Sequence, residues 1–244
     1  AQNILIENNA IAGVNGDFFG MKGNYSAPFG TIINDGKLIS LNPNINSESA
    51  EYSSFVIDNE NNPFMTYIKS EINFINNGQK NIDIASVNKI TDMKYPVYID
   101  RNAMTNTKAL DERFADLVKI VISEGVISYI SQRGETVEIP ENGYIIVLNS
   151  YFADYELHKF CVGQKAEFNI KSTVDLDKIK TMFGGVGRIL IDGQPTNNSG
   201  IVIKGRQPRT ALGLTFDKNT LIIMVVDGRT HSIGATQEEI AQLM

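Results

Sequence analysis

The sequence predicts an α+β protein built on a large sheet that is mostly antiparallel or mixed, with a few short helices. Short apolar segments recur along the chain and are separated by glycine-containing turns, which is typical of antiparallel hairpins. Helical signals are sparse, and the clearest is a capping box in which Thr236 is followed at the third position by Glu239. With 244 residues, of which 42% are hydrophobic, the chain can bury a substantial core.

The N-terminal half contains one helix end and a series of short strands. Residues 2–9 resemble the last turns of a helix, and a turn is expected at 15–17. Strands are expected at residues 10–14, 29–33, 37–40, 53–57, 63–68, 82–84 and 95–100. Asn34-Asp35-Gly36 and Asn76-Asn77-Gly78 are the expected hairpin turns. Residues 41–108 are rich in Asn and Ser and are interpreted as a strand-and-loop insertion.

The C-terminal half continues the pattern. Residues 117–123 and 126–131 form a hairpin around Glu124-Gly125, and short helices are expected at 149–157 and from Thr236 onward. Further strands are expected at residues 144–148, 165–171, 188–191, 212–216 and 221–226. The whole chain, 1–244, is therefore expected to be a single domain.

Composition excludes several classes of function. The net charge is −6 and no cluster of basic residues is present, so nucleic acid is not an expected partner. No apolar run reaches the roughly 18 residues of a membrane span. The single cysteine, Cys161, rules out a disulfide framework, and its apolar neighbours predict a buried, inert thiol. No metal or cofactor is expected from ligand spacing, although a calcium site built from loop oxygens stays open.

Polar residues gather where predicted strands begin and end. Arg209 and Thr210 precede the strand at 212–216, while Asp227 and Arg229 follow the apolar strand at 221–226. Near the N-terminus, Asn15-Gly16-Asp17 follows the predicted strand at 10–14. A sheet fixes the backbone up to the point where such side chains emerge, so strand ends are common positions for active-site residues.

Five motifs in this order resemble those of the phosphodiester glycosidase family. They are Asn15-Gly16-Asp17-Phe18-Phe19, Ile139-Pro140-Glu141-Asn142-Gly143-Tyr144, Phe183-Gly184-Gly185 with Leu190-Ile191-Asp192-Gly193, Arg209-Thr210-Ala211-Leu212-Gly213, and Val226-Asp227-Gly228-Arg229. The resemblance implies a hydrolase that cleaves the glycosidic bond of a sugar-1-phosphodiester in a glycan or cell-wall polymer. It also implies an extracytoplasmic location, since bacterial members of the family are often exopolysaccharide-related.

The same resemblance assigns roles to particular residues. Arginine suits the phosphodiester because its planar fork meets two phosphate oxygens, and aspartate suits water activation or stabilisation of an oxocarbenium ion. The implied catalytic residues are Asp17, Arg209, Asp227 and Arg229. The implied substrate-binding residues are Asn15, Gly184, Gly185, Thr210 and His231. We expect these residues to share one cleft, with the ends of the strands at Val14, Leu212 and Val226 converging and the Gly184-Gly185 turn as a wall.

Each of these residues also has a structural interpretation. Asp227-Gly228 can be a strand-ending turn, Asp17 can bind its own turn, and Arg209 can be a surface ion-pair partner. His231 can be an exposed loop histidine. Two other functions therefore stay open: a non-catalytic glycan- or wall-binding module, and a phosphodiesterase that cuts the P–O bond.

The family pattern continues beyond the motifs found here. In the family, an Asp-Gly-Gly-Gly-Ser segment follows the helix that begins at Thr236, and this sequence does not contain it. Strands that usually precede the first motif are absent too. The expectation is a chain trimmed at both ends, or one whose missing segment is supplied by a second polypeptide.

Overall fold

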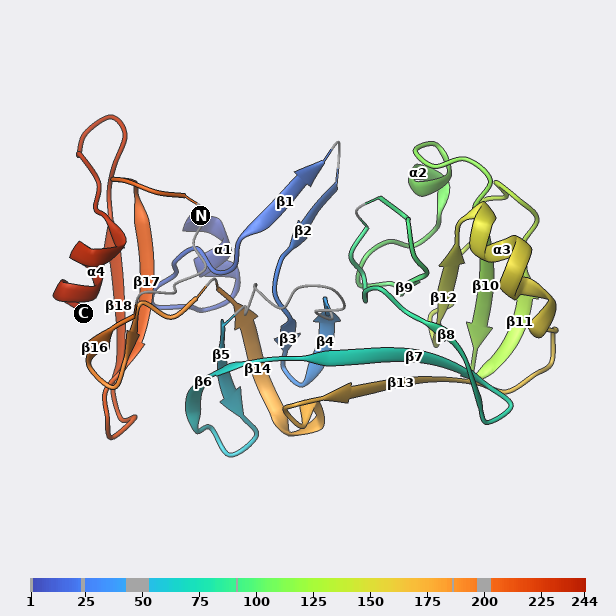
Figure 1. The fold of residues 1–244 in the computed structure, drawn as a ribbon, viewed down its shortest axis with the longest axis horizontal. Coiled ribbons are helices and arrows are strands. Elements are labelled where there is room, and N and C mark those ends of the chain that lie inside the picture. The colour runs from blue at the N-terminus through green and yellow to red at the C-terminus, as the bar shows by residue number, and fades with distance from the viewer. Residues whose placement is uncertain (1, 23–24, 43–52, 91, 186, 197–202) are drawn as a thin grey trace.

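The computed structural model describes residues 2–22, 25–42, 53–90, 92–185, 187–196 and 203–244. The molecule is elongated, with a four-stranded sheet at one end, a β-hairpin with a helix at the other and two sheets between them (Figure 1). All strand pairings between the described elements are antiparallel, and one isolated bridge, Val87–Tyr98, is parallel. The helices are short, so the predicted α+β class is confirmed.

The four-stranded sheet has the order β11-β10-β12-β9 and is buried on both faces. Its elements are β9 (Val97–Ile99), α2 (Lys108–Asp111), β10 (Val118–Ser123), β11 (Val126–Ile130), β12 (Gly143–Leu148) and α3 (Ser150–Glu156). Alternation along β10 directs Ile120 and Ile122 into one hydrophobic cluster and Val121 into a second cluster on the opposite face. Both clusters are continuous with residues of the surrounding loops and helices.

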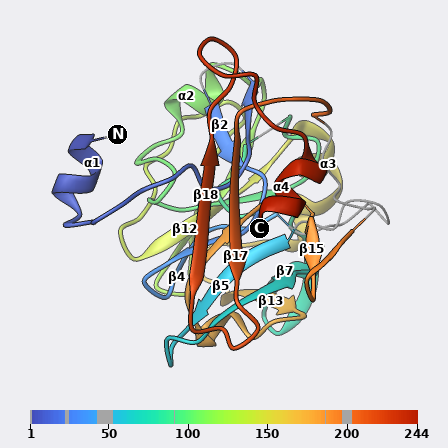
Figure 2. The same cartoon turned by 90° about the vertical axis from the view of Figure 1, so that its left-hand side faces the viewer.

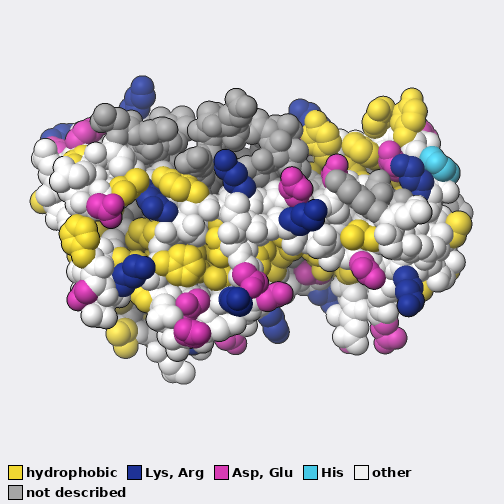
Figure 3. All heavy atoms as spheres, turned by 60° about the horizontal axis from the view of Figure 1, so that its bottom comes forward, with side chains coloured by type: hydrophobic (Ala, Val, Ile, Leu, Met, Phe, Trp, Pro, Cys, Tyr) yellow, Lys and Arg dark blue, Asp and Glu magenta, His cyan; other side chains and the backbone are white. Residues whose placement is uncertain are grey.

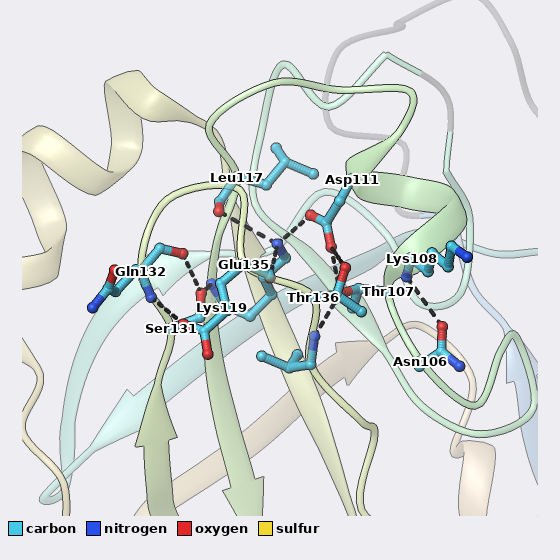
Figure 4. Close-up of polar contacts among 11 residues, drawn as sticks. Asn106, Thr107, Lys108, Asp111, Leu117, Lys119, Ser131, Gln132, Glu135 and Thr136 are labelled. Atoms are coloured by element: carbon cyan, nitrogen blue, oxygen red, sulfur yellow. Dashed lines mark hydrogen bonds and ion pairs between the residues drawn. The ribbon is translucent and has the colours of Figure 1, made fainter.

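Lys119 is a charged residue in the middle of this sheet, and its side chain is fully buried (Figure 4). Its ammonium group forms an ion pair with Asp111 and donates to the backbone carbonyl of Glu135 at 2.7 Å. The Asp111 carboxylate also accepts hydrogen bonds from the hydroxyls of Thr107 at 2.7 Å and Thr136 at 3.2 Å. The buried charge is therefore paired and hydrogen-bonded, which is the condition under which burial is tolerated.

Two sheets occupy the centre of the molecule, with strand orders β13-β7-β8 and β4-β3-β14-β5-β6. Their elements are β3 (Ile32–Asn34), β4 (Lys37–Ser40), β5 (Ser53–Asp58), β6 (Pro63–Tyr67), β7 (Ser70–Asn76), β8 (Gln79–Asp83), η1 (Leu157–Lys159), β13 (Ala166–Ser172), η2 (Leu176–Lys178) and β14 (Ile179–Gly184). Strands from residues 41–108 pair with strands from later in the chain: β5 with β14, β7 with β13 and β9 with β12. Residues 41–108 thus contribute strands to all three larger sheets.

The remaining elements lie toward the other end of the molecule, apart from the β1–β2 hairpin near its middle (Figure 1). They are α1 (Gln2–Glu7), β1 (Phe19–Lys22), β2 (Tyr25–Pro28), β15 (Leu190–Ile191), β16 (Gln194–Pro195), β17 (Arg209–Leu214), β18 (Leu221–Val226) and α4 (Gln237–Leu243). Figure 2 shows α4 beside the β17–β18 hairpin, to the right of β17. The predicted capping box opens α4: the Thr236 hydroxyl accepts from the Glu239 amide, and the Glu239 carboxylate accepts from the Thr236 amide.

The predicted hairpin turns at Asp35-Gly36, Asn77-Gly78 and Glu124-Gly125 are confirmed, because all six residues have positive φ. The strand predicted at 10–14 is wrong: this segment is exposed, contains a bend at Ile11 and has no partner strand among the described residues. The predicted strand at 188–191 shrinks to β15, and β14 and the β1–β2 hairpin were not predicted. The expectation of a buried thiol is also wrong, since Cys161 is exposed. Strand β18 alternates between exposed and half-buried residues, so its apolar run is not buried as a whole.

Candidate functional site

The carboxylate of Asp17 lies at the meeting point of three segments that are distant in sequence. One oxygen accepts a hydrogen bond from the Phe18 amide at 2.7 Å, and the other accepts from the Gly30 amide at 2.5 Å. Phe18 and Phe19, which follow directly, expose large parts of their rings. Asp17 therefore has a fixed orientation beside an aromatic surface.

Two glycines make room for this carboxylate. A Cβ atom at Gly184 would lie 2.7 Å from the Gly30 Cα and 2.9 Å from the Asp17 Oδ2. A Cβ atom at Gly30 would lie 2.6 Å from the Gly184 Cα and 3.0 Å from the same oxygen. Any side chain at either position would force the backbone segments apart. The end of β14 and the segment before β3 are thus in direct contact, with Asp17 against both.

The positive charge of Lys89 acts on the Asp17 carboxylate. Lys89 is not among the residues that the sequence motifs predicted for the site. Only 6% of Lys89 is exposed, and its ammonium group donates to the Phe29 carbonyl at 3.3 Å and lies 5.3 Å from the centre of the Phe29 ring. The preceding residue, Asn88, adopts a left-handed backbone conformation with φ of 55°. Its side chain bridges the Ile39 carbonyl and Asp100, which fixes this loop.

Burial shifts the pKa values of both charged groups toward their neutral forms. Burial raises the pKa of the Asp17 carboxyl above its ordinary value, although the hydrogen bonds from Gly30 and Phe18 and the charge of Lys89 oppose the shift. Burial lowers the pKa of Lys89 to about 8, and the charge of Asp17 opposes that shift. Two coupled, partly desolvated groups of opposite charge in one place are typical of functional sites.

A second group of predicted residues lies at one end of the β17–β18 hairpin. Arg209 pairs across the hairpin with Val226. Its guanidinium group donates to the carbonyls of Ile203 at 3.0 Å, Gly205 at 2.9 Å and Ala235 at 3.3 Å. Arg209 therefore holds two loops together, so most of its donors are already used by the protein.

Asp227, Arg229, His231 and Thr210 are exposed at this end of the hairpin. Arg229 has a φ of 75°, an uncommon backbone conformation for a residue with a side chain. Among the described residues, Asp227 and Arg229 have no hydrogen-bond or ion-pair partner for their side chains. These two charged groups are thus available to a ligand, in contrast to Arg209.

The described residues show no hydrogen bond or ion pair between the Asp17 group and the hairpin group. Asp17 and Gly184 are in contact, and the Gly185 amide donates to the Ser53 carbonyl at 2.8 Å. Asn15, two residues before Asp17, is exposed. Arg209 shares a hairpin face with Val226, the last residue of β18, and Asp227 lies directly after the strand. A single cleft that holds all nine residues stays a prediction.

Two negative observations concern the described residues alone. In them, no three His, Cys, Asp or Glu side chains are grouped as a metal site would require. None of the helices among them combines the length and apolar character needed to cross a bilayer.

Solved structures share the fold across nearly the whole chain. A hypothetical protein from Synechocystis superposes with a TM-score of 0.73 at 17% identity, covering 99% of this chain and 44% of its own. A protein from Burkholderia pseudomallei that is described as exported gives a TM-score of 0.73 at 16% identity, covering 99% of this chain and 58% of its own. The chain thus spans about half the length of these two proteins. No curated protein gives a significant match.

The sequence itself defines a glycosidase-like class of protein. Residues 116–244, more than half of the chain, match the sequence profile of a family described as phosphodiester glycosidase. The chain belongs to the phosphodiester glycosidase family.

Proposed function

We propose that this protein hydrolyses the glycosidic bond of a sugar-1-phosphodiester in a glycan or cell-wall polymer, with Asp17 at the reaction centre. The observation that carries the proposal is the Asp17 carboxylate, which two backbone amides orient and two glycines enclose. Family membership supports a glycosidase-like function in general. The exposed rings of Phe18 and Phe19 offer apolar faces for a sugar beside the carboxylate.

The chemistry asks for few groups. Water adds to the anomeric carbon and loses a proton, while the C–O bond breaks and the phosphomonoester leaves with the bonding electrons. A phosphomonoester is already a stable anion, so it needs less protonation than an ordinary alcohol leaving group. Asp17 then serves as the base for water or as the negative charge that stabilises an oxocarbenium-like transition state. The Lys89 charge favours the ionised form of Asp17.

The hairpin group forms the second part of the proposal. Asp227 and Arg229 are exposed and have no partner among the described side chains, so they can contact a charged or hydroxylated part of the substrate. Arg209 acts as a positioning residue, because its hydrogen bonds to three carbonyls fix the loops around it. Thr210, His231, Asn15 and the Gly184-Gly185 backbone remain proposed substrate contacts.

An extracytoplasmic location fits this substrate class. Glycan and wall polymers lie outside the cytoplasm, and the structurally similar protein from Burkholderia pseudomallei is described as exported. A location outside the cytoplasm is therefore part of the proposal.

The test is turnover of a synthetic sugar-1-phosphodiester, such as the methyl diester of N-acetylglucosamine-1-phosphate. Asp17→Asn should lower kcat/KM by about 100-fold or more, because a neutral amide can neither accept the proton nor stabilise positive charge. The matched control is Asp35→Asn, in the β3–β4 turn, where asparagine also tolerates the positive φ. If Asp17→Asn turns over as fast as the control, Asp17 is not at the reaction centre.

Hydrolysis in ¹⁸O-labelled water distinguishes the bond that is cut. Label in the released sugar marks C–O cleavage, whereas label in the phosphate marks a phosphodiesterase that cuts the P–O bond.

A second candidate function is a glycan- or wall-binding module without turnover. The observation that favours it is that both Asp17 oxygens accept hydrogen bonds from the protein itself. Binding of the diester with unmeasurable turnover in the wild-type protein would select this candidate.

A further inference from the structure

A cluster of exposed aromatic rings lies on the lobe that holds the four-stranded sheet. Tyr95, Tyr151 and Tyr155 are 54%, 62% and 61% exposed, although large aromatic side chains usually bury most of their surface. Hydrophobic side chains project from the end of the molecule that carries α3 (Figure 3). We call the three tyrosines, together with Phe152, the aromatic platform.

The rings of the platform are in mutual contact. Tyr151 and Tyr155 are one helical turn apart on α3, and their ring centres are 4.7 Å apart. Tyr151 also contacts Phe152 at 5.5 Å, and Phe152 contacts Tyr95 at 6.1 Å. Phe152 is half-buried and packs against the main hydrophobic cluster, so it connects the platform to the core.

The backbone beneath the platform is fixed. Asn149 caps α3 by accepting a hydrogen bond from the Phe152 amide at 2.9 Å. Its amide group donates to the carbonyls of Met93 at 3.0 Å and Lys94 at 3.1 Å, which hold the segment that carries Tyr95 against the start of α3. A ligand therefore meets rings that are already positioned, which lowers the entropic cost of binding.

The charges around the platform cancel in pairs. Ion pairs join Asp92 with Lys94, Arg133 with Asp154, and Glu156 with Lys159. A surface with compensated charges offers no net attraction to nucleic acid or to an anionic lipid surface. No hydrogen bond of the three exposed phenol hydroxyls is found among the described residues, so these groups are free to pair with hydroxyls of a ligand.

We propose that the aromatic platform binds a neutral stretch of a glycan chain, apart from the Asp17 site. A pyranose ring has apolar C–H faces and a rim of hydroxyls, and a tyrosine offers the complementary aromatic face and hydroxyl. The rings are tilted against one another, by 48° between Tyr151 and Tyr155, so each ring can offer its own face to a different sugar of the chain. The proposal is independent of catalysis, since a platform of this kind retains a polymer whether or not the protein cleaves it.

The experiment measures binding of the full chain to three neutral hexasaccharides, cellohexaose, maltohexaose and chitohexaose, by isothermal titration calorimetry. At least one should bind to the wild-type protein. The double variant Tyr151→Ala/Tyr155→Ala should weaken that binding by about tenfold or more, because it removes two stacking faces. The double Phe variant keeps both faces and should retain most of the affinity.

The control is Phe216→Ala, which removes an exposed ring from the β17–β18 turn and should leave the affinity unchanged. Circular dichroism checks that the variants fold. Absence of binding to all three sugars, or equal affinity of the double Ala variant and the wild type, overturns the proposal. So does binding to anionic vesicles, or self-association, that is lost in the double Ala variant while sugar binding is unaffected. Turnover of the diester is measured separately, so failure of the platform and failure of the Asp17 site are distinguishable.

Discussion

Strand β10 in the four-stranded sheet and strand β18 in the C-terminal hairpin have similar apolar sequences and very different surroundings. Strand β10 lies between β11 and β12, and both faces of its sheet are covered. Strand β18 has β17 as its one partner strand among the described elements. Its residues Leu221, Ile223 and Val225 remain 43%, 45% and 59% exposed. A run of valine and isoleucine therefore predicts a strand, and the neighbours decide whether it is core.

The difference has a physical cause on the hairpin. Cross-strand pairs place Ala211, Gly213 and Met224 on one face, where Met244, directly after α4, packs so closely that a Cβ atom at Gly213 would lie 2.5 Å from its Cε. The opposite face carries Leu221, Ile223 and Val225, and no described residue gives it comparable cover. The same period-2 alternation directs side chains into two buried clusters around β10, but into only one packed face of the hairpin. Stability is expected to be concentrated at the β10 end of the molecule.

The largest effect is expected for Asp111→Ala at that end. This change leaves the Lys119 ammonium group buried without its counter-ion, which should lower the free energy of unfolding by about 3–5 kcal/mol. Urea denaturation measures it. The control is Asp154→Ala, which breaks the exposed ion pair with Arg133 and should cost less than about 1 kcal/mol. A loss below about 1 kcal/mol in Asp111→Ala, like that expected for the control, would show that the buried pair is dispensable.

The next effect concerns Lys89 and pH. The pKa of Lys89 is about 8 in the folded protein and 10.5 is its ordinary value, so the unfolded chain binds more protons between these pH values. The free energy of unfolding should therefore rise by up to about 3 kcal/mol from pH 8 to pH 10.5 relative to Lys89→Met. Below pH 8 the difference between the two proteins should be flat. Denaturation at pH 7, 8.5 and 10 tests the slope.

Lys89→Arg serves as the control for this pH effect. Arginine stays charged over the whole window, so this variant should lack the rise as well. A wild-type slope that matches both variants would show that Lys89 is solvated like an ordinary lysine.

Lys89 also shows why the site was only partly predictable. Asp17, Gly184 and Gly185 carry local signals, because an aspartate in a turn and a glycine pair stand out in the sequence. Lys89 has none: it contacts Phe29, sixty positions earlier, and its charge interacts with that of Asp17. A lysine between Asn88 and Ile90 has no visible periodic or spacing pattern. The contact of Gly30 with Gly184 likewise depends on tertiary structure, and no local sequence pattern predicts it.

The fold, like the site, contains elements that local sequence predicts and elements that it does not. Two-residue turns such as Asp35-Gly36 are fixed by the φ values that glycine and Asx residues tolerate, so the three predicted hairpin turns were correct. The segment 10–14 failed because apolar character is not sufficient for a strand without a partner, and Ile11 is fully exposed. Strand β14 escaped prediction although it is central, because Lys180 and Thr181 interrupt its apolar pattern.

A moderate effect is expected where the two glycines meet. In Gly184→Ala, the new methyl group would lie within 3 Å of the Gly30 Cα and the Asp17 Oδ2, so the free energy of unfolding should fall by about 1–3 kcal/mol. The neighbouring change Gly185→Ala is the matched control, since its methyl group would meet only the Ser53 carbonyl at 3.7 Å. Thermal denaturation compares the two. A larger loss in Gly185→Ala would contradict the proposed packing of the carboxylate.

The smallest effect on the free energy of unfolding is expected on the exposed face of the hairpin. The same substitution, made once in β12 and once in β18, measures how much burial contributes to that effect. Valine to threonine keeps the β-branched shape and replaces a methyl group with a hydroxyl. Val147→Thr in β12 places that hydroxyl in a fully buried cluster and should cost about 2 kcal/mol. Val225→Thr in β18 leaves the hydroxyl in water and should change the free energy of unfolding by less than about 0.5 kcal/mol. Urea denaturation of the two variants measures both values. If Val225→Thr costs as much as Val147→Thr, the outer face of the hairpin is covered in solution, and the contrast between the two ends of the molecule disappears.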